Sequence, residues 1–234
     1  AFLAALLDSL PMGFYAAPQL VRDARAHGVA VRPVDITISH WDSTLEPQSP
    51  HEAAPACAAR AIPGGQCAVR LGLNRVGGLG EDEGRRIVAA RAQAPFASVE
   101  DLARRAELDA HSLQCLAAAD ALAALAGDRR DAVWAVAGVD TRATPLLKAT
   151  RTVEDAEPEF EALTLGDAVL ADYRALGLSL KGHPLALLRA ALAPFKVQQA
   201  ALLNAECRPG QLARASGLVT HRQQPGTAKG VVFV

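Results

Sequence analysis

A glycine-rich turn between two helical patterns limits the fold of this chain more than any other feature. The turn is Gly78-Leu79-Gly80. Apolar residues at helical spacing, and one further glycine, flank it: Leu73, Val76, Gly84, Ile87 and Val88. Glycine permits a positive φ and lets the main chain approach another molecule closely. The segment therefore predicts a helix-hairpin-helix pattern, in which two short helices meet at a tight turn.

The geometry of such a turn suits the binding of a phosphate group. Amides of the turn and of the following helix N-terminus point outward, where their partial positive charge favours an anion. A contact of this kind holds the nucleic-acid backbone and reads no bases. We expect a positive φ at Gly80, and DNA contacts from the turn and from three nearby cations. The candidate residues are Gly78, Leu79, Gly80, Arg75, Arg85 and Arg86.

Two departures from the pattern favour a simpler interpretation, in which the turn only connects two helices. Gly84 replaces the alanine that is usual at its position. Glu81 and Asp82 stand where a basic residue would attract a phosphate. From this motif alone, both interpretations stay open.

Further helices are predicted to follow the turn and to complete a small helical module. Apolar periodicity predicts a helix over residues 81–91. Ser98, with Asp101 three residues later, is typical of a capped second helix, and Asp109 of a third. The last helix of the module is predicted over residues 129–137.

The segment before the module is predicted to contain two helices and some short strands. Residues 2–7 predict the end of a buried helix, and a second helix begins near Pro18 and ends at Gly28. Alternating apolar residues predict extended segments over 29–38 and a strand over 67–73. Between them, residues 46–65 contain four prolines and no periodicity, which predicts a loop or linker.

The segment after the module changes its charge along the chain. Residues 154–172 contain seven acidic residues, which most simply form a solvated face. Thr164 is expected to cap a helix that ends at Gly177, and a further helix is expected from His183 to Leu192. No acidic residue follows Glu206. Residues 211–234 alternate around a Pro-Gly pair, which predicts the start of a β-hairpin.

Composition narrows the class of protein only slightly. The net charge of −1 gives no overall nucleic-acid signature, and the bias of 20 Arg against 4 Lys is typical of a GC-rich genome. The four cysteines are too scattered for a zinc site and are expected to be buried thiols of a cytoplasmic protein. Residues 1–10 are too short for a membrane span and lack the basic region of a signal peptide. Both ends are interpreted as cut from a longer chain.

No catalytic residue and no metal site is predicted. The six histidines show no HExxH spacing, and no phosphate-binding loop follows a strong strand pattern. The acid pair Glu154-Asp155 lies in a polar, low-complexity context, whereas metal-binding carboxylates need a rigid element to hold them.

Several stretches resemble the bacterial C-family DNA polymerases, the family of the replicative polymerase III alpha subunit. Residues 1–46 resemble the end of the fingers region, and residues 69–134 its tandem helix-hairpin-helix module. Residues 163–188 resemble the connecting helices, and residues 211–234 the first strands of an OB-fold. The more specific segments are Gly13-Phe14-Tyr15 and Pro225-Gly226-Thr227-Ala228-Lys229-Gly230. Segments that resemble the error-prone branch are His40-Trp41-Asp42, residues 176–181 and residues 222–233.

The resemblance implies a mainly α fold with four parts. These are the end of a fingers region with a linker (1–65), the tandem helix-hairpin-helix module (66–138), connecting helices (139–208) and a truncated OB-fold hairpin (209–234). The module would hold duplex DNA through Gly78, Leu79 and Gly80. Arg222 and Lys229, in the hairpin, would meet single-stranded template.

For the whole protein, the resemblance implies template-dependent dNTP addition during damage-induced, mutagenic synthesis. The Mg²⁺ of that reaction would lie in a palm domain before Ala1, and no cofactor is expected in this segment. Expected partners are DNA, the rest of the polymerase, other mutagenesis proteins and the sliding clamp, without a membrane. Two other functions stay open: a DNA-repair scaffold without polymerase activity, and a helical protein–protein adaptor that uses the acidic segment.

Overall fold

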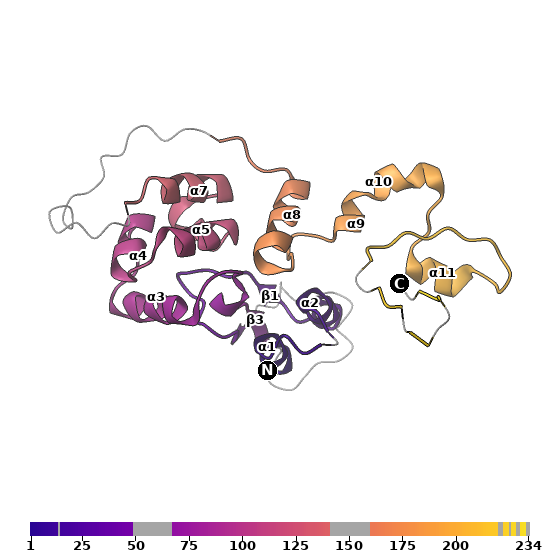
Figure 1. Ribbon diagram of the computed structural model, residues 1–234, viewed down its shortest axis with the longest axis horizontal. Coiled ribbons are helices and arrows are strands. Elements are labelled where there is room, and N and C mark those ends of the chain that lie inside the picture. Colours follow the sequence, from indigo (N-terminus) through magenta and orange to yellow (C-terminus); the bar gives the residue numbers. More distant parts are fainter. Residues whose placement is uncertain are drawn as a thin grey trace. The chain divides into compact units, whose positions relative to one another are not determined.

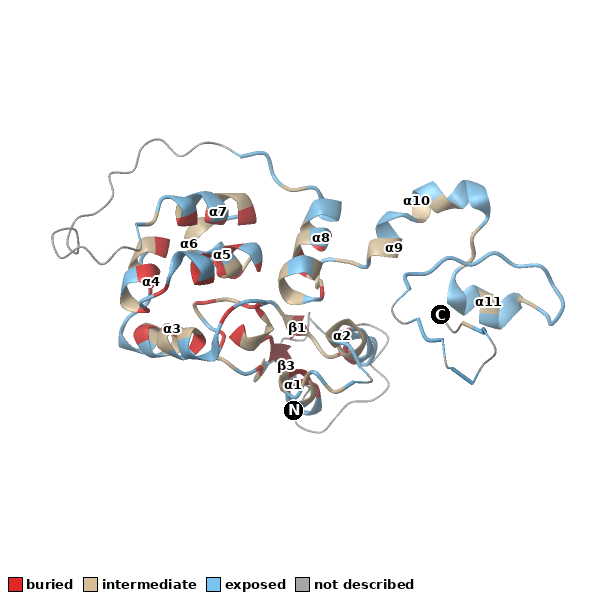
Figure 2. Ribbon diagram, in the orientation of Figure 1, coloured by how far each residue is buried: buried red, intermediate tan, exposed pale blue. Residues whose placement is uncertain are grey.

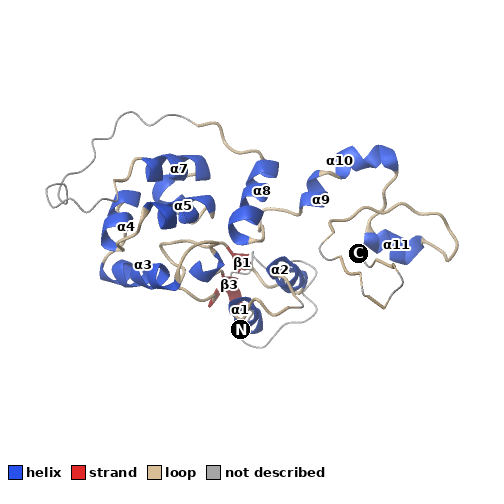
Figure 3. Ribbon diagram, viewed as in Figure 1, coloured by secondary structure: helices blue, strands red, loops and turns tan. Residues whose placement is uncertain are grey.

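The computed structural model describes residues 1–13, 15–48, 67–140, 160–219, 222–224, 226–227 and 230–232. Most of its regular elements are helices, and every named strand of the described residues lies between Val31 and Arg70 (Figure 3). The chain divides into two compact units, Ala1–Lys181 and Gly182–Val234. The mainly α fold class expected from the sequence is therefore confirmed.

A three-stranded sheet lies in the N-terminal part of the first unit. Its strands are β1 (Val31–Arg32), β2 (Thr44–Pro47) and β3 (Cys67–Arg70), in the order β1-β3-β2. β3 runs parallel to β1 and antiparallel to β2. Glu46 on β2 joins all three strands, because its carboxylate bonds Arg70 on β3 (2.9 Å) and Arg32 on β1. The hydrogen bond from Arg70 lowers the pKa of Glu46 and so keeps this carboxylate charged.

The strands are shorter than the alternating patterns predict. The strand expected over 67–73 stops at Arg70, because at Gly72 the chain passes so close to the Trp41 carbonyl that a Cβ would overlap it. A 3₁₀ helix, η3 (Leu73–Arg75), follows. Of the extended segments expected over 29–38, only β1 is a strand. Asp35 turns the chain after it, since its carboxylate accepts from the Thr37 amide at 2.8 Å.

Two helices flank this sheet, as the sequence predicts. α1 (Phe2–Asp8) and α2 (Ala17–Ala26) contact each other (Figure 1). Their buried residues Leu7 and Val21 belong to the same core as Val69 of β3. Gly28, with a φ of 81°, follows α2 and allows the chain to turn back toward the sheet.

Five helices form the helical module. They are α3 (Glu81–Gln93), α4 (Val99–Arg105), α5 (Ala110–Ala118), α6 (Ala123–Ala126) and α7 (Arg129–Ala137). The predicted caps are confirmed: Ser98 accepts from the Asp101 amide at 3.1 Å, and Asp109 from the Ser112 amide at 2.7 Å. Each of α3, α4, α5 and α7 contains buried apolar residues, whereas the short α6 contains none. Figure 2 colours the buried residues of the module red.

The helix α8 (Leu165–Leu176) completes the first unit. Thr164 caps it by accepting from the Asp167 amide at 3.2 Å, and Gly177 ends it with a φ of 71°, both as predicted. Near its C-terminal end, the Ala175 carbonyl accepts a hydrogen bond from the Gly77 amide at 2.8 Å. α8 therefore contacts the glycine-rich turn directly.

The second unit contains α9 (Pro184–Leu187), α10 (Arg189–Leu192), η4 (Ala193–Phe195) and α11 (Ala200–Glu206). The single helix expected from His183 to Leu192 is thus two short helices that meet at Leu188. None of the described residues of this unit is buried, and Leu212 is 94% exposed. The unit has no hydrophobic core of its own among these residues.

The β-hairpin expected over 211–234 stays a prediction. Within the described part of that stretch, no strand longer than a single bridge is present, and Ala215 pairs with Gln198 across that bridge. Residues 220–221, 225, 228–229 and 233–234 lie outside the described residues. The described helices are all too short or too polar to cross a lipid bilayer.

Candidate nucleic-acid interface

The glycine-rich turn joins η3 to α3 with its apolar side chains inside and its glycines outside. Leu73, Val76 and Leu79 are buried, whereas the flanking glycines Gly78 and Gly80 are exposed. The Leu79 amide donates to the Val76 carbonyl at 3.3 Å, which closes the turn. The alternation of apolar and glycine residues in the sequence thus corresponds to an alternation of inside and outside positions.

The two outer glycines have different conformations. Gly78 has a φ of 86°, in the left-handed region that favours glycine. A Cβ at this position would also lie 2.9 Å from Cys115 Sγ and 3.3 Å from His111 Nε2. Gly80 is the N-cap of α3 and has a φ of −80°, which any residue can adopt. The expectation of a positive φ at Gly80 was therefore wrong, because the turn reverses direction at Gly78.

Several amides at this turn have no hydrogen-bond partner in the described part of the chain. The amides of Gly78, Gly80, Glu81 and Asp82 make no hydrogen bond to another described residue. The first amides of a helix have no intrahelical acceptor, and Gly80 has no side chain to cap them. These residues are exposed, so their amides lie at the protein surface, where the Glu83 carboxylate lies beside Gly80 and would have to move for an anion from solvent.

The three candidate arginines differ in how far they are available. Arg75 donates to the Leu7 carbonyl at 3.1 Å. Arg86 donates to the Ala106 carbonyl at 2.9 Å. Both guanidinium groups therefore bind main-chain carbonyls of segments that pack beside them. Arg85 is exposed on α3 and pairs with Glu81 at 2.5 Å, and this hydrogen bond raises the pKa of Arg85. Among the three, Arg85 is the one that holds no backbone carbonyl, so a bound phosphate would compete only with its exposed partner Glu81.

A second hairpin, between α4 and α5, repeats the geometry of the first. Glu107 has a φ of 51° where the first hairpin has Gly78, and Leu108 is buried as Leu79 is. The N-cap Asp109 occupies the place of Gly80. Its carboxylate already accepts from the Ser112 amide, and this hydrogen bond lowers the pKa of Asp109. The tandem arrangement is confirmed, but the second turn places negative side chains where the first has glycines.

Two residues at the first hairpin, His111 and Cys115, were not predicted from the sequence. Both lie on α5, one helical turn apart, and His111 Nε2 is 3.6 Å from Cys115 Sγ. They are the residues nearest to a Cβ built on Gly78. Their spacing of four residues indicates a shared helix face. Only the tertiary fold brings that face to a turn more than 30 residues earlier in the chain.

The remaining candidate residues lie in the second unit. Arg222 is exposed, and Lys229 lies outside the described residues. The structure does not place this unit relative to the first. The two residues therefore stay candidates on the basis of the sequence.

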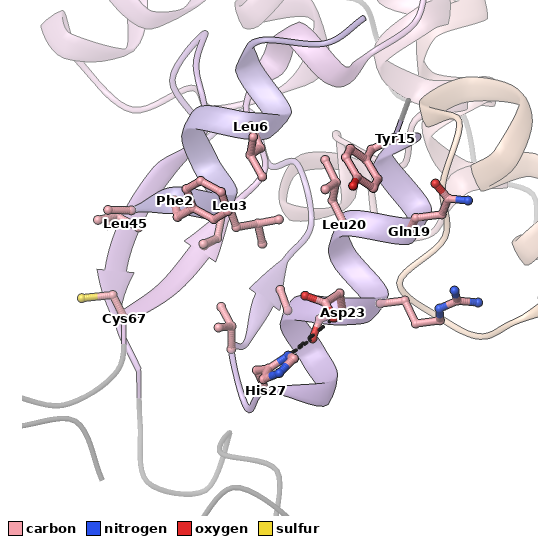
Figure 4. Close-up of a pocket in the computed structure, with 15 residues that line it drawn as sticks. Phe2, Leu3, Leu6, Tyr15, Gln19, Leu20, Asp23, His27, Leu45 and Cys67 are labelled. Atoms are coloured by element: carbon pink, nitrogen blue, oxygen red, sulfur yellow. Dashed lines mark hydrogen bonds and ion pairs between the residues drawn. The ribbon is translucent and has the colours of Figure 1, made fainter. Parts of the chain in front are cut away.

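A mainly apolar cavity of the first unit is separate from the hairpin. It has a volume of about 1000 Å³ and is lined by residues of α1, α2 and the sheet (Figure 4). Its polar lining residues include His27 and Asp23, with 3.6 Å between ring nitrogen and carboxylate. Figure 4 shows Cys67 on the other side of the cavity, away from that pair. The lining thus offers no arrangement of nucleophile and base.

Among the described residues, no three His, Cys, Asp or Glu side chains come together as a metal site.

Comparison with known proteins gives a family for this arrangement. A family model described as a helix-hairpin-helix motif matches residues 28–132. The chain is 56% identical over 234 residues to an error-prone DNA polymerase of Burkholderia pseudomallei and 53% identical over 236 residues to one of Ralstonia nicotianae. A third such polymerase, of Azoarcus, is 50% identical over 242 residues. Each match covers 100% of this chain but 21% of the relative.

The chain thus spans about a fifth of the length of the curated relatives that it matches. The match extends over both hairpins and over both units, so it is not limited to one short motif. The resemblance to the error-prone branch of the C-family polymerases is confirmed, because the chain is similar over its whole length to polymerases of that name.

Proposed function

We propose that this segment holds the backbone of duplex DNA through its first hairpin, within an error-prone DNA polymerase. One observation carries the proposal: exposed glycines and unpartnered amides at the start of α3 lie in a helix-hairpin-helix motif. Backbone amides at a helix N-terminus recognise phosphate oxygens and are indifferent to sequence.

The charges around the hairpin limit the strength of this contact. The first turn of α3 carries Glu81, Asp82 and Glu83, which repel a phosphate. Ion pairs with Arg85 and Arg86 offset two of these three charges. One or two phosphates can reach the free amides, so the isolated segment should bind weakly and release few counterions.

We expect the 234-residue chain to bind double-stranded DNA weakly and without sequence preference. The measurement is fluorescence anisotropy with labelled duplexes of several sequences at two or more salt concentrations. The slope of log K against log salt should be about −1 to −2, the value for one or two phosphate contacts. Affinity that differs more than about tenfold between duplexes would require base contacts and would contradict the proposal. Binding that is absent for DNA, or that ignores salt, would instead favour a protein–protein adaptor.

For the longer protein, we infer template-dependent addition of dNTPs during mutagenic synthesis past damaged template. The printed name of the relatives, error-prone DNA polymerase, supports this inference. The role of the present segment is to retain the duplex. Contact of Arg222 and Lys229 with single-stranded template belongs to the same proposal, because a basic stretch without acids suits a single strand.

We expect the full-length protein to extend a primed template, and the 234-residue chain alone to add no nucleotide. The physical reason is that the described residues offer no cluster of carboxylates to hold a catalytic metal. Both proteins are compared in one primer-extension assay at equal molar concentration, with an unprimed template as control. Extension by homogeneous 234-residue chain would contradict this division of roles.

A further inference from the structure

The imidazole of His111 lies at the outer face of the first hairpin, although it belongs to α5. His111 is exposed, and its Nε2 atom is 3.3 Å from the position of a Cβ on Gly78. Gly78 is exposed as well, and its amide has no partner among the described residues. A phosphate bound at the amides of this turn would therefore also be within reach of the imidazole.

The hairpin itself provides few cations for such a phosphate. Arg75 and Arg86 bond neighbouring carbonyls, and Arg85 is paired with Glu81. A histidine that becomes charged changes this balance, because it adds one positive charge and a donor at the same point.

The other ionisable groups close to His111 keep one charge state through neutral pH. Burial raises the pKa of the Cys115 thiol, so this group stays neutral. Hydrogen bonds from Ser112 lower the pKa of Asp109, so that carboxylate stays ionised; His111 and Arg86 of α3 add to this shift. Among the described residues, no hydrogen bond or ion pair joins His111 to α7 or α8, which also pack against α5.

We propose that His111 is a DNA-contacting residue of the first hairpin, which in its protonated form donates from Nε2 to the phosphate held by the turn. The proposal rests on the proposed function of the hairpin and extends it. The positive charge of this phosphate site then comes from α5, whereas the helix that begins at the turn is α3. Duplex binding is then coupled to protonation of this side chain.

The test compares duplex binding by the 234-residue chain at pH 6 and pH 8 and constant salt. We expect the parent chain to bind roughly five- to tenfold more tightly at pH 6, the size of one charged hydrogen bond. His111→Gln should bind equally at both pH values. His111→Lys should bind at pH 8 about as tightly as the parent binds at pH 6. His27→Gln is the matched control, because His27 lies at the C-terminal end of α2 and not at the hairpin. Its duplex binding should change with pH as that of the parent does.

The possible results separate this proposal from the one on which it rests. If the parent chain binds no duplex at either pH, the proposed function fails. If the parent binds duplex but His111→Gln keeps the full pH dependence, only the assignment of His111 is overturned. Circular dichroism of each variant verifies folding, and His111→Lys provides the decisive comparison if the Gln variant is unstable.

Discussion

Replacement of Gly78 by valine is expected to abolish measurable duplex binding and to destabilise the protein. Valine is poorly tolerated at a φ of 86°, and its Cβ would lie 2.9 Å from Cys115 Sγ. The cost in free energy of unfolding should be about 2–3 kcal/mol, the sum of backbone strain and displacement of α5. Urea unfolding measures the stability. Anisotropy, under conditions where the variant is folded, measures the loss of binding, which we expect to exceed tenfold.

Gly80→Ala provides the matched control within the same turn. Its φ of −80° suits any residue, and the group that a Cβ would meet is the carboxylate end of the flexible Glu83 side chain. Stability should therefore change by less than about 1 kcal/mol, and binding should be mostly retained. If Gly80→Ala is as damaging as Gly78→Val, the distinction between the two glycines is incorrect.

This contrast shows what a local pattern predicts and what it does not. The Gly-apolar-Gly pattern predicts the turn, because its closing contacts join residues only three or four positions apart. It does not predict which glycine carries the positive φ, because both positions lack a Cβ. The caps at Ser98, Asp109 and Thr164 could be predicted for the same reason, since each side chain bonds an amide three residues later.

The arginines of the site depend on distant partners and could not be assigned from the sequence. Arg86 bonds a carbonyl 20 residues away, and Arg75 one 68 residues away. A guanidinium that satisfies a carbonyl is indistinguishable in sequence from one that is free to contact DNA. His111 reaches the hairpin from another helix for the same reason: the tertiary fold, not the spacing, makes it a neighbour of Gly78.

The β-structure shows a further limit of sequence patterns. Alternating apolar residues over 29–38 and 67–73 predict strands longer than those present. A strand requires a partner along its whole length, and local contacts such as those of Asp35 end the pairing early. In the second unit, the alternation over 211–234 has no core to cover among the described residues. Periodicity therefore indicates where side chains can alternate, while the available partners decide whether a strand forms.

A buried ionic network holds α8 to the helical module. Arg129, at the start of α7, pairs with Asp172 of α8, and both side chains are buried. Asp172 also accepts from Ser179 Oγ at 2.7 Å, and Lys181 Nζ lies 3.4 Å from it. Arg129 donates to the Ala168 carbonyl at 3.2 Å as well. These bonds fix the helix whose Ala175 carbonyl contacts the first hairpin.

Removal of one partner of this network is expected to be more damaging than removal of the pair. Asp172→Ala leaves the buried guanidinium of Arg129 with only the more distant Asp120, 4.0 Å away, which should lower the free energy of unfolding by about 3–5 kcal/mol. The double variant Arg129→Met/Asp172→Leu leaves no buried charge uncompensated and fills similar volume. It should recover most of that loss. Urea unfolding of the parent, of Asp172→Ala and of the double variant measures these differences.

The exposed pair of Arg85 and Glu81 is the control for burial. Glu81→Ala should leave the urea midpoint unchanged, because an ion pair in water gains little over its solvated partners. The double variant of Arg129 and Asp172 could instead be as unstable as Asp172→Ala. In that case the hydrogen bonds of the network themselves stabilise the fold, beyond the compensation of its buried charges. Because α8 contacts Gly77, such a loss should also weaken duplex binding at the hairpin. The packing of one helix would then control both the stability of the module and the geometry of its phosphate site.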